Sequence, residues 1–289
     1  MRVPGDWRAS SIRLTLELLD RFPWAMGEAC CAAMFVARAV VSPRRMEKAL
    51  TWAAHHPQAG RSRWRAAVST CAYQGRFRAR HALLGLRSPN ELLERVRLVG
   101  GQHLPPAGGA LLLGFHLGPP AIGAALCAAG HRVLSIEGRR ASRSWSSAAW
   151  EPVRRTVDPI PLAEEPAALA ATLYLARTRL LEGETVYMAA DGARGRLAFV
   201  VTFPGGTEHP IRAGWLRLRR DCRVPVLPVV GHMDGRTQVI TIHPPLPAPD
   251  PDPARDMVVC RDAVTAILDA FVRRFPEQCC GLVYDAAGR

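Results

Sequence analysis

From residue 96 onward, short apolar runs alternate with stretches of helical periodicity, and this alternation restricts the possible folds more than any other feature of the chain. We expect strands at 96–99, 109–115, 132–136, 185–189, 197–203, 224–231 and 236–243, and helices near 119–129, 164–182, 210–220 and 254–274. Strands without a polar face are typical of a parallel sheet that helices cover on both sides. The sequence therefore predicts an α/β fold with a largely parallel central sheet flanked by helices, and ligands at the carboxyl ends of its strands.

The N-terminal third of the chain is helical and basic. Residues 8–87 show helical periodicity, with breaks near Ser42-Pro43 and His56-Pro57. The first 100 residues hold 17 Lys and Arg against 7 Asp and Glu, a net charge of +10, whereas the remaining 189 carry only +3. We expect a helical membrane-association region over residues 1–95 and a separate α/β domain over residues 96–289.

The stretch "RSRWRAAVSTCAYQGRFRAR", residues 61–80, carries six arginines and no acid, with Trp64 and Tyr73 among them. A basic helix with aromatic side chains suits an anionic membrane surface. A plain solvated helix face is the alternative. Nucleic acid is not an expected partner, because no recognised nucleic-acid motif accompanies the charge.

The apolar run from Phe22 to Val41 is long enough to cross a bilayer but contains Glu28 and Arg38. A charge at the centre of a span costs about 2.5–3.5 kcal/mol, which favours a helix lying in the membrane interface. We therefore expect this helix to lie on a membrane surface and not to span the bilayer.

Several familiar functional patterns are absent from the sequence. The eight cysteines form no Cys-x-x-Cys pair, so no metal site is expected. The sequence also lacks the Gly-x-Ser-x-Gly elbow, the Gly-x-Gly-x-x-Gly turn and the phosphate loop, which argues against hydrolases, dehydrogenases and nucleotide hydrolases. Three polar segments follow predicted strands instead, namely "GFHLGPP", "YMAADGARGR" and "VTFPGGTEHPIRAG".

These segments and their order resemble the bacterial lipid A biosynthesis late acyltransferases, the lauroyl and myristoyl transferases of the lysophospholipid acyltransferase superfamily. The similar stretches are "VRLVGGQHLPPAGGALLLGFHLGPP", "VYMAADGARGR", "FVVTFPGGTEHPIRAGWLRL", "CRVPVLPVVGHMDGRTQVITIHPPL" and "FVRRFPEQ". The resemblance implies transfer of an acyl chain from acyl carrier protein or coenzyme A to a hydroxyl or amine of a lipid-like acceptor. A shared family does not fix the substrate.

The family's hallmark is a histidine followed five positions later by Asp or Glu, and this chain keeps only the histidine. His116 matches it, whereas Ala121 stands in place of the acid. Either another loop supplies the acid, or the chain is a catalytically degenerate member that binds acyl chains, lipid or carrier protein without transfer.

The chemistry needs few groups. A neutral His116 takes a proton from the acceptor while that atom attacks the thioester carbonyl, and the thiolate leaves unaided. The oxyanion needs donors, available from backbone N–H groups around Gly114 to Gly118 or from an arginine. No metal or bound cofactor is expected.

The resemblance also marks candidate substrate-binding residues. Arg139 and Arg140 follow the strand "VLSI" and suit an acceptor phosphate or a carrier phosphopantetheine, although a solvated pair is equally plausible. Candidates in the later segments are Arg194, Phe203, Gly205 and Arg212, the last at the start of a helix. For His209 we favour an ordinary residue at the start of that helix, before Pro210.

Asp191 is the acid that we expect to partner His116. The stretch "GETVYMAADGARG" predicts a buried strand that ends at the same sheet edge as His116, provided that the two strands lie close together. Glu137 is the second choice. The alternative is that Asp191 pairs with Arg194 or caps its own Asp-Gly turn.

Overall fold

We analysed a computed structural model of the chain, which describes residues 21–86, 95–119, 122–128, 130–138, 158–162, 166–192 and 197–284. Its α-helices are α2 (Trp24–Val40), α3 (Pro43–His55), α4 (Arg63–Leu86), α6 (Ile122–Ala128), α8 (Pro166–Leu181), α9 (Gly214–Cys222), α10 (Pro253–Arg274) and α11 (Cys280–Tyr284). Short 3-10 helices are η1 (Gly101–His103), η2 (Pro204–Gly206) and η3 (Pro276–Gln278).

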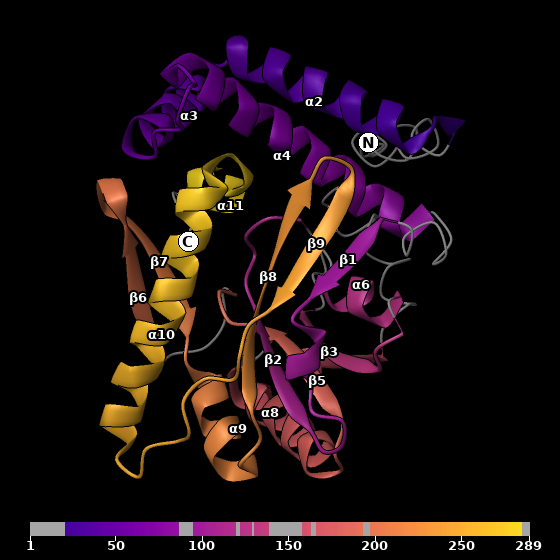
Figure 1. Cartoon of the computed structure of the whole chain (residues 1–289), viewed down its shortest axis with the longest axis vertical. Coiled ribbons are helices and arrows are strands. Elements are labelled where there is room, and N and C mark those ends of the chain that lie inside the picture. Colours follow the sequence, from indigo (N-terminus) through magenta and orange to yellow (C-terminus); the bar gives the residue numbers. More distant parts are fainter. Residues whose placement is uncertain are drawn as a thin grey trace, which may run out of the picture.

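A mostly parallel sheet forms the centre of the molecule, as the alternating pattern predicts (Figure 1). Its strands are β1 (Val96–Val99), β2 (Ala110–Gly114), β3 (Val133–Gly138), β4 (Asp158–Leu162), β5 (Thr185–Ala189), β8 (Val226–Asp234) and β9 (Thr237–Ile242), in the order β1-β9-β8-β2-β5-β3-β4. Only β8 and β9 pair antiparallel. Strand β2 lies directly beside β5, so the two strands that precede His116 and Asp191 are neighbours.

Strand β2 has no polar side chain because both of its faces are buried. Leu111 and Leu113 pack into a large core with residues of α8, α9 and α10, whereas Leu112 packs on the other face with residues of α6. All five residues of β2 are buried. A strand covered on both faces needs apolar side chains in both directions, which removes the polar alternation of a half-exposed strand.

The start of one predicted helix is wrong, because those residues belong to a separate two-stranded sheet. Strands β6 (Ala198–Phe203) and β7 (Thr207–Arg212) form an antiparallel hairpin, and helix α9 begins only at Gly214. Residues 210–212, which we expected in a helix near 210–220 with Arg212 at its start, therefore belong to a strand. Pro210 is tolerated there because β7 pairs on one side only, with β6.

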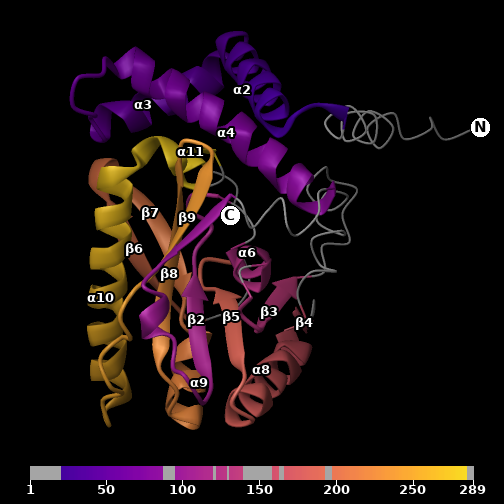
Figure 2. The ribbon, with the colours of Figure 1, turned by 45° about the vertical axis from the view of Figure 1, so that its right-hand side comes forward.

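Helices α2, α3 and α4 form a layer at one end of the molecule (Figures 1 and 2). The buried Glu28 carboxylate on α2 accepts a hydrogen bond from Trp24 and pairs with Arg80 of α4 at 2.5 Å. Within the described part of the chain, no single helix is long and apolar enough to cross a membrane; α2 and α3, bent by 102° at their junction, pass that length and composition criterion only as a pair.

Candidate active site

The two strand ends that the sequence singled out meet at one edge of the sheet. His116 follows β2 and Asp191 follows β5, and the ladder aligns Gly114 with Ala189. The backbone N–H of Ala190 donates to the carbonyl of Gly114 at 2.9 Å, which extends this pairing by one step beyond the strands. The two loops therefore leave the sheet side by side, which places the two side chains within reach of each other.

Asp191 contacts His116 twice. Its Oδ1 lies 2.7 Å from the ring Nδ1 of His116, and its Oδ2 accepts the backbone N–H of the same residue at 2.7 Å. The proximity expected from the sequence is thus present, within the 3.2 Å that a hydrogen bond allows. The ionised carboxylate has no proton to give, so Nδ1 carries the proton and donates it. The other ring nitrogen, Nε2, is left with a lone pair, as a general base requires.

The two side chains differ sharply in exposure. The imidazole of His116 is 65% exposed, whereas the carboxylate of Asp191 is fully buried at 0%. Burial alone would raise the pKa of Asp191, but the interaction with His116 and the hydrogen bonds from His116 and His209 outweigh it, so the net pKa lies well below its usual value. The acid stays ionised inside the protein while the base faces the solvent, where a substrate can reach it.

The structure adds a second histidine that the sequence analysis had assigned to the start of a helix. His209 lies on β7 and is buried, and its Nε2 lies 3.0 Å from Oδ2 of Asp191. Nothing local in "TEHPIRAG" indicates this contact, because it depends on the hairpin register that sets His209 opposite Val201. Residues 207–212 show no alternation of polar and apolar side chains that would predict a strand, and the alternation appears only in their burial, where His209 and Ile211 are the buried positions.

Arg212 braces the loop that carries Asp191. Its backbone N–H donates to the carbonyl of Ala190 at 2.6 Å, and its Nε donates to the carbonyl of Gly192 at 3.0 Å. These two bonds fix the residues on either side of Asp191. The role that we expected for Arg212, binding of substrate, stays a prediction beside this structural one.

Both candidate glycines lie at positions that packing explains. Gly118 has a φ of +73°, and a Cβ there would lie 1.9 Å from the carbonyl oxygen of Gly231. Gly205 has a φ of +82°, and its Cβ would lie 2.4 Å from the ring of His55. A side chain at either position would combine a left-handed backbone with a steric clash.

Two of the backbone N–H groups proposed for the oxyanion are engaged. His116 N–H donates to Asp191, and Gly118 N–H donates to the carbonyl of Gln278 at 3.2 Å. The N–H groups of Phe115 and Leu117 and an arginine stay the candidates for oxyanion stabilisation.

Of the remaining candidates, the structure describes Phe203. It is buried in the core and lines a cavity of about 550 Å³ between the hairpin and α10, and its ring centroid lies 6.4 Å from that of His209. Arg139, Arg140 and Arg194, like Ala121, lie outside the described residues. Within the described part, no three His, Cys, Asp or Glu side chains are grouped so that they could hold a metal ion.

Comparison with known proteins finds similarity among solved structures. No family model matches the sequence, and no curated protein matches it. The crystal structure of the 1-acyl-sn-glycerophosphate (LPA) acyltransferase, PlsC, from Thermotoga maritima is similar to this chain, with a TM-score of 0.42 and 15% identity, over 92% of this chain and 99% of that one. At this level of similarity, function has to be inferred from the side chains of the site.

Proposed function

We propose that this protein is an acyltransferase that moves a fatty acyl chain from a thioester to a hydroxyl or amine of a lipid-like acceptor. The observation that carries the proposal is the pair formed by His116 and Asp191, an exposed imidazole oriented by a fully buried carboxylate at the carboxyl end of a central strand. This geometry suits a general base whose tautomer is fixed by an acid.

In the proposed reaction, Nε2 of His116 accepts the proton of the acceptor as the acceptor atom bonds to the thioester carbonyl carbon. The tetrahedral intermediate then collapses, the carbon–sulfur bond breaks, and the thiolate takes the proton from the imidazolium. Asp191 stabilises that imidazolium without taking its proton. For the oxyanion we propose an arginine, with Arg194 as the candidate because it follows Asp191 by three positions in the sequence.

The acid missing at position 121 was the reason to consider a degenerate, non-catalytic protein. We propose that Asp191 takes the place of that acid, since it contacts the imidazole from the neighbouring strand. The acyl-transfer test below decides between this proposal and the degenerate alternative. The proposed enzyme uses acyl carrier protein or coenzyme A thioester as its donor and needs no metal or cofactor.

We also propose that the enzyme is attached peripherally to the cytoplasmic face of a bacterial inner membrane through helices α2 to α4. Two contacts bring this helical layer close to the site. The Cβ position of Gly205, in the hairpin that carries His209, lies against His55 of α3. Helix α11 makes the second contact: the hydroxyl of Tyr284 lies 3.1 Å from Sγ of Cys71 on α4, and a Cβ on Gly281 would lie 3.1 Å from the carbonyl oxygen of His116. A lipid acceptor held at this layer would therefore be near the base.

The test is acyl transfer by purified protein, with radiolabelled acyl carrier protein or acyl-CoA as donor and a bacterial lipid extract as acceptor. We expect His116→Ala and Asp191→Asn to lower the rate by about 10²–10⁴-fold, the usual contribution of a general base and its orienting acid. His131→Ala, which alters a histidine before β3 at the opposite edge of the sheet, should retain the parent rate. Equal rates for His116→Ala and the parent would refute the mechanism.

The acceptor is identified separately. Lipid extracts of cells with and without the gene are compared by mass spectrometry, and the acylated species that disappears names the acceptor and the chain. If no lipid changes and the purified protein transfers no acyl chain, the proposed function is wrong.

A further inference from the structure

Among the described residues, two histidines donate three hydrogen bonds to the Asp191 carboxylate, and one of these bonds comes from outside the His116–Asp191 pair. Oδ1 accepts from the His116 ring, whereas Oδ2 accepts both from the His116 backbone N–H and from Nε2 of His209. We propose that His209 is a positioning residue, which pins Oδ2 so that Oδ1 holds the His116 ring in the Nδ1–H tautomer. The predicted effect of His209 on acyl transfer rests on the proposed function, whereas its predicted effect on the His116 tautomer does not.

The fold delivers His209 to this place through the β6–β7 hairpin. His209 faces Val201 across the hairpin ladder, and its ring centroid lies 6.4 Å from that of Phe203. The bond from Arg212 N–H to the carbonyl of Ala190 then joins β7 to the residue before Asp191. The hairpin and the β5 loop are thus fixed to each other next to the His209–Asp191 contact.

The burial of His209 indicates what this imidazole contributes. Its Nδ1 is buried and has no hydrogen-bond partner among the described residues, so one polar atom of the ring is left unsatisfied. An unsatisfied buried polar atom destabilises the folded state, and an apolar residue would avoid that cost. Within the described part of the chain, the bond from Nε2 to Asp191 is the polar contact by which a histidine differs here from a leucine of similar size.

The effect on His116 follows from the geometry of a carboxylate. With Oδ2 held by two donors, the carboxylate plane cannot turn about its own axis, and Oδ1 stays directed at Nδ1 of His116. Without His209, Oδ2 loses one of these two donors in a buried site, and the plane gains freedom to turn. The His116 ring is 65% exposed, so a carboxylate that turns leaves its tautomer mixed.

The experiment compares four variants of the full-length chain. His209→Leu removes the donor, His209→Gln restores an N–H at the reach of Nε2, and His209→Asn carries the same amide on a shorter side chain. Val201→Ala is the control, because it disturbs the same hairpin at the residue opposite His209 without a contact to Asp191. Nitrogen-15 NMR of labelled histidine reports the tautomer of His116, with the signal assigned from His116→Ala.

We expect His116 in the parent to be almost entirely the Nδ1–H tautomer, with the hydrogen-bonded proton shifted downfield. His209→Leu and His209→Asn should give a mixture and lower kcat by roughly tenfold with KM within twofold, well short of the ~10⁴ that loss of an orienting acid costs. His209→Gln should recover both readouts, and Val201→Ala should change neither. Should His209→Leu fail to fold, the Asn and Gln pair carries the comparison.

The positioning role is wrong if the tautomer of His116 in His209→Asn matches that of the parent, or if Val201→Ala shifts it as much as His209→Asn does. The proposed function fails differently. If the parent transfers no acyl chain but the tautomer still responds to His209→Asn and recovers in His209→Gln, acyl transfer is excluded and the positioning role stands.

Discussion

At the scale of single residues, His56 marks the junction between the helical layer and the α/β part. It follows α3, is buried, and stacks on Trp52 with ring centroids 3.9 Å apart. Burial lowers the pKa of His56 to about 4, and the neighbouring His55 and Arg273 add to the effect. The folded protein therefore holds this imidazole neutral at a pH where the unfolded chain would already protonate it.

Stability should accordingly fall as the pH drops from about 6.5 to about 4. In this window the unfolded state binds a proton at His56 that the folded state does not, so acid favours unfolding; below pH 4 both states are protonated and the penalty stays constant. The full penalty is on the order of 3 kcal/mol. Urea unfolding at a series of pH values measures it, and His56→Gln should flatten the curve between pH 6.5 and 4 while following the parent above pH 7.

Asp191 of the site affects stability over a different pH range from His56. The pKa of Asp191 is lowered, so its stabilising contribution is present above the ordinary carboxyl range and is lost only as the pH falls below about 4. If His56→Gln loses stability between pH 6.5 and 4 as steeply as the parent, His56 is not the group responsible.

The residues of the site differ in how far the sequence could reveal them. His116 and Asp191 each follow a buried strand directly, and parallel strands bring such residues to one edge. His209 reaches the same carboxylate only through the register of a hairpin outside the main sheet. Its neighbour Pro210 favours the first turn of a helix in isolation, so the local signal pointed away from the observed strand.

At the scale of elements, both strands that the sequence analysis missed contain proline and have a strand partner on one side only. β4, "DPIPL", contains two prolines and lies at an edge of the main sheet, where one side of the strand needs no ladder partner. β7 contains Pro210 and pairs only with β6. The apolar central strands were predictable because burial on both faces leaves a continuous signal, whereas an edge strand is defined by a neighbour far away in the sequence.

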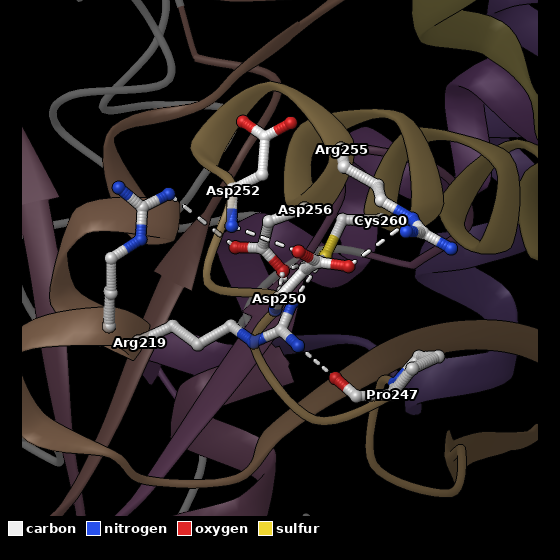
Figure 3. A network of polar contacts seen from close by, with 8 residues as sticks. Arg219, Pro247, Asp250, Asp252, Arg255, Asp256 and Cys260 are labelled. Atoms are coloured by element: carbon white, nitrogen blue, oxygen red, sulfur yellow. Dashed lines mark hydrogen bonds and ion pairs between the residues drawn. The ribbon is translucent and has the colours of Figure 1, made fainter.

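A buried ion pair joins α9 to the start of α10 (Figure 3). The guanidinium of Arg219 lies 3.2 Å from the carboxylate of Asp256, and both side chains are almost fully buried. Arg219 also donates to the carbonyl of Pro247 and to Sγ of Cys260. The network thus fixes the loop before α10 as well as the helix, at the end of the molecule opposite the helical layer (Figure 1).

Replacing one partner of this ion pair should lower the free energy of unfolding far more than replacing both partners. Arg219→Met leaves the buried Asp256 charge with its longer ion pair to Arg220, at 3.6 Å. Loss of one partner of a buried pair typically costs about 3–5 kcal/mol, and the pair with Arg220 should keep the cost at the lower end of that range, whereas Arg219→Met combined with Asp256→Leu should recover most of the loss. Urea unfolding gives the free energies. Arg217→Met, on the same helix but exposed, is the matched control and should cost less than about 1 kcal/mol. Equal losses for Arg217→Met and Arg219→Met would show that the buried pair does not hold the two helices together.

At the scale of the whole molecule, the helical layer is joined to the α/β part more closely than a separate membrane region over residues 1–95 suggests. The indole N–H of Trp52 donates to the carbonyl of Pro276 at 2.9 Å, and Trp52 packs in the main core. Arg80 donates to the carbonyl of Arg236 at 2.7 Å. Such contacts join residues more than 150 positions apart, so composition, which showed the change of character near residue 95, could not reveal them.

Strands β2 and β5 run toward the helical layer, so the site at their carboxyl ends lies at that end of the molecule (Figure 2). The arrows of β2 and β5 point to the end of the molecule that α2 to α4 cover, which places their carboxyl ends near the basic helices (Figure 2). Of the six arginines in 61–80, Arg80 is buried in an ion pair with Glu28 and does not reach a membrane surface. Arg61, Arg63 and Arg65 remain exposed at the start of α4, and Trp64 beside them is 52% exposed.

We predict that these exposed arginines attach the protein to anionic membranes. Each arginine near an anionic leaflet contributes about 1 kcal/mol, so replacing Arg61, Arg63 and Arg65 together by Gln should weaken binding by about 100-fold. Sedimentation with vesicles of phosphatidylglycerol and phosphatidylethanolamine measures the bound fraction. Binding by the parent should fall steeply with added salt, because exposed charges are screened beyond a Debye length of about 10 Å at 0.1 M.

The control removes the same charge from the other end of the molecule. Arg217, Arg223 and Arg255 are exposed on and around α9 and the start of α10, opposite the helical layer (Figure 1). Replacing all three by Gln lowers the net charge by as much as the α4 triple variant does. If membrane binding depended on net charge alone, both triple variants would lose the same affinity. If the two variants lose binding equally, or if the parent binds purely zwitterionic vesicles in high salt, attachment does not proceed through the arginines of α4. A loss confined to the α4 variant places the membrane at the end of the molecule where His116 faces the solvent, and an acceptor already held in that membrane would reach the base without leaving it.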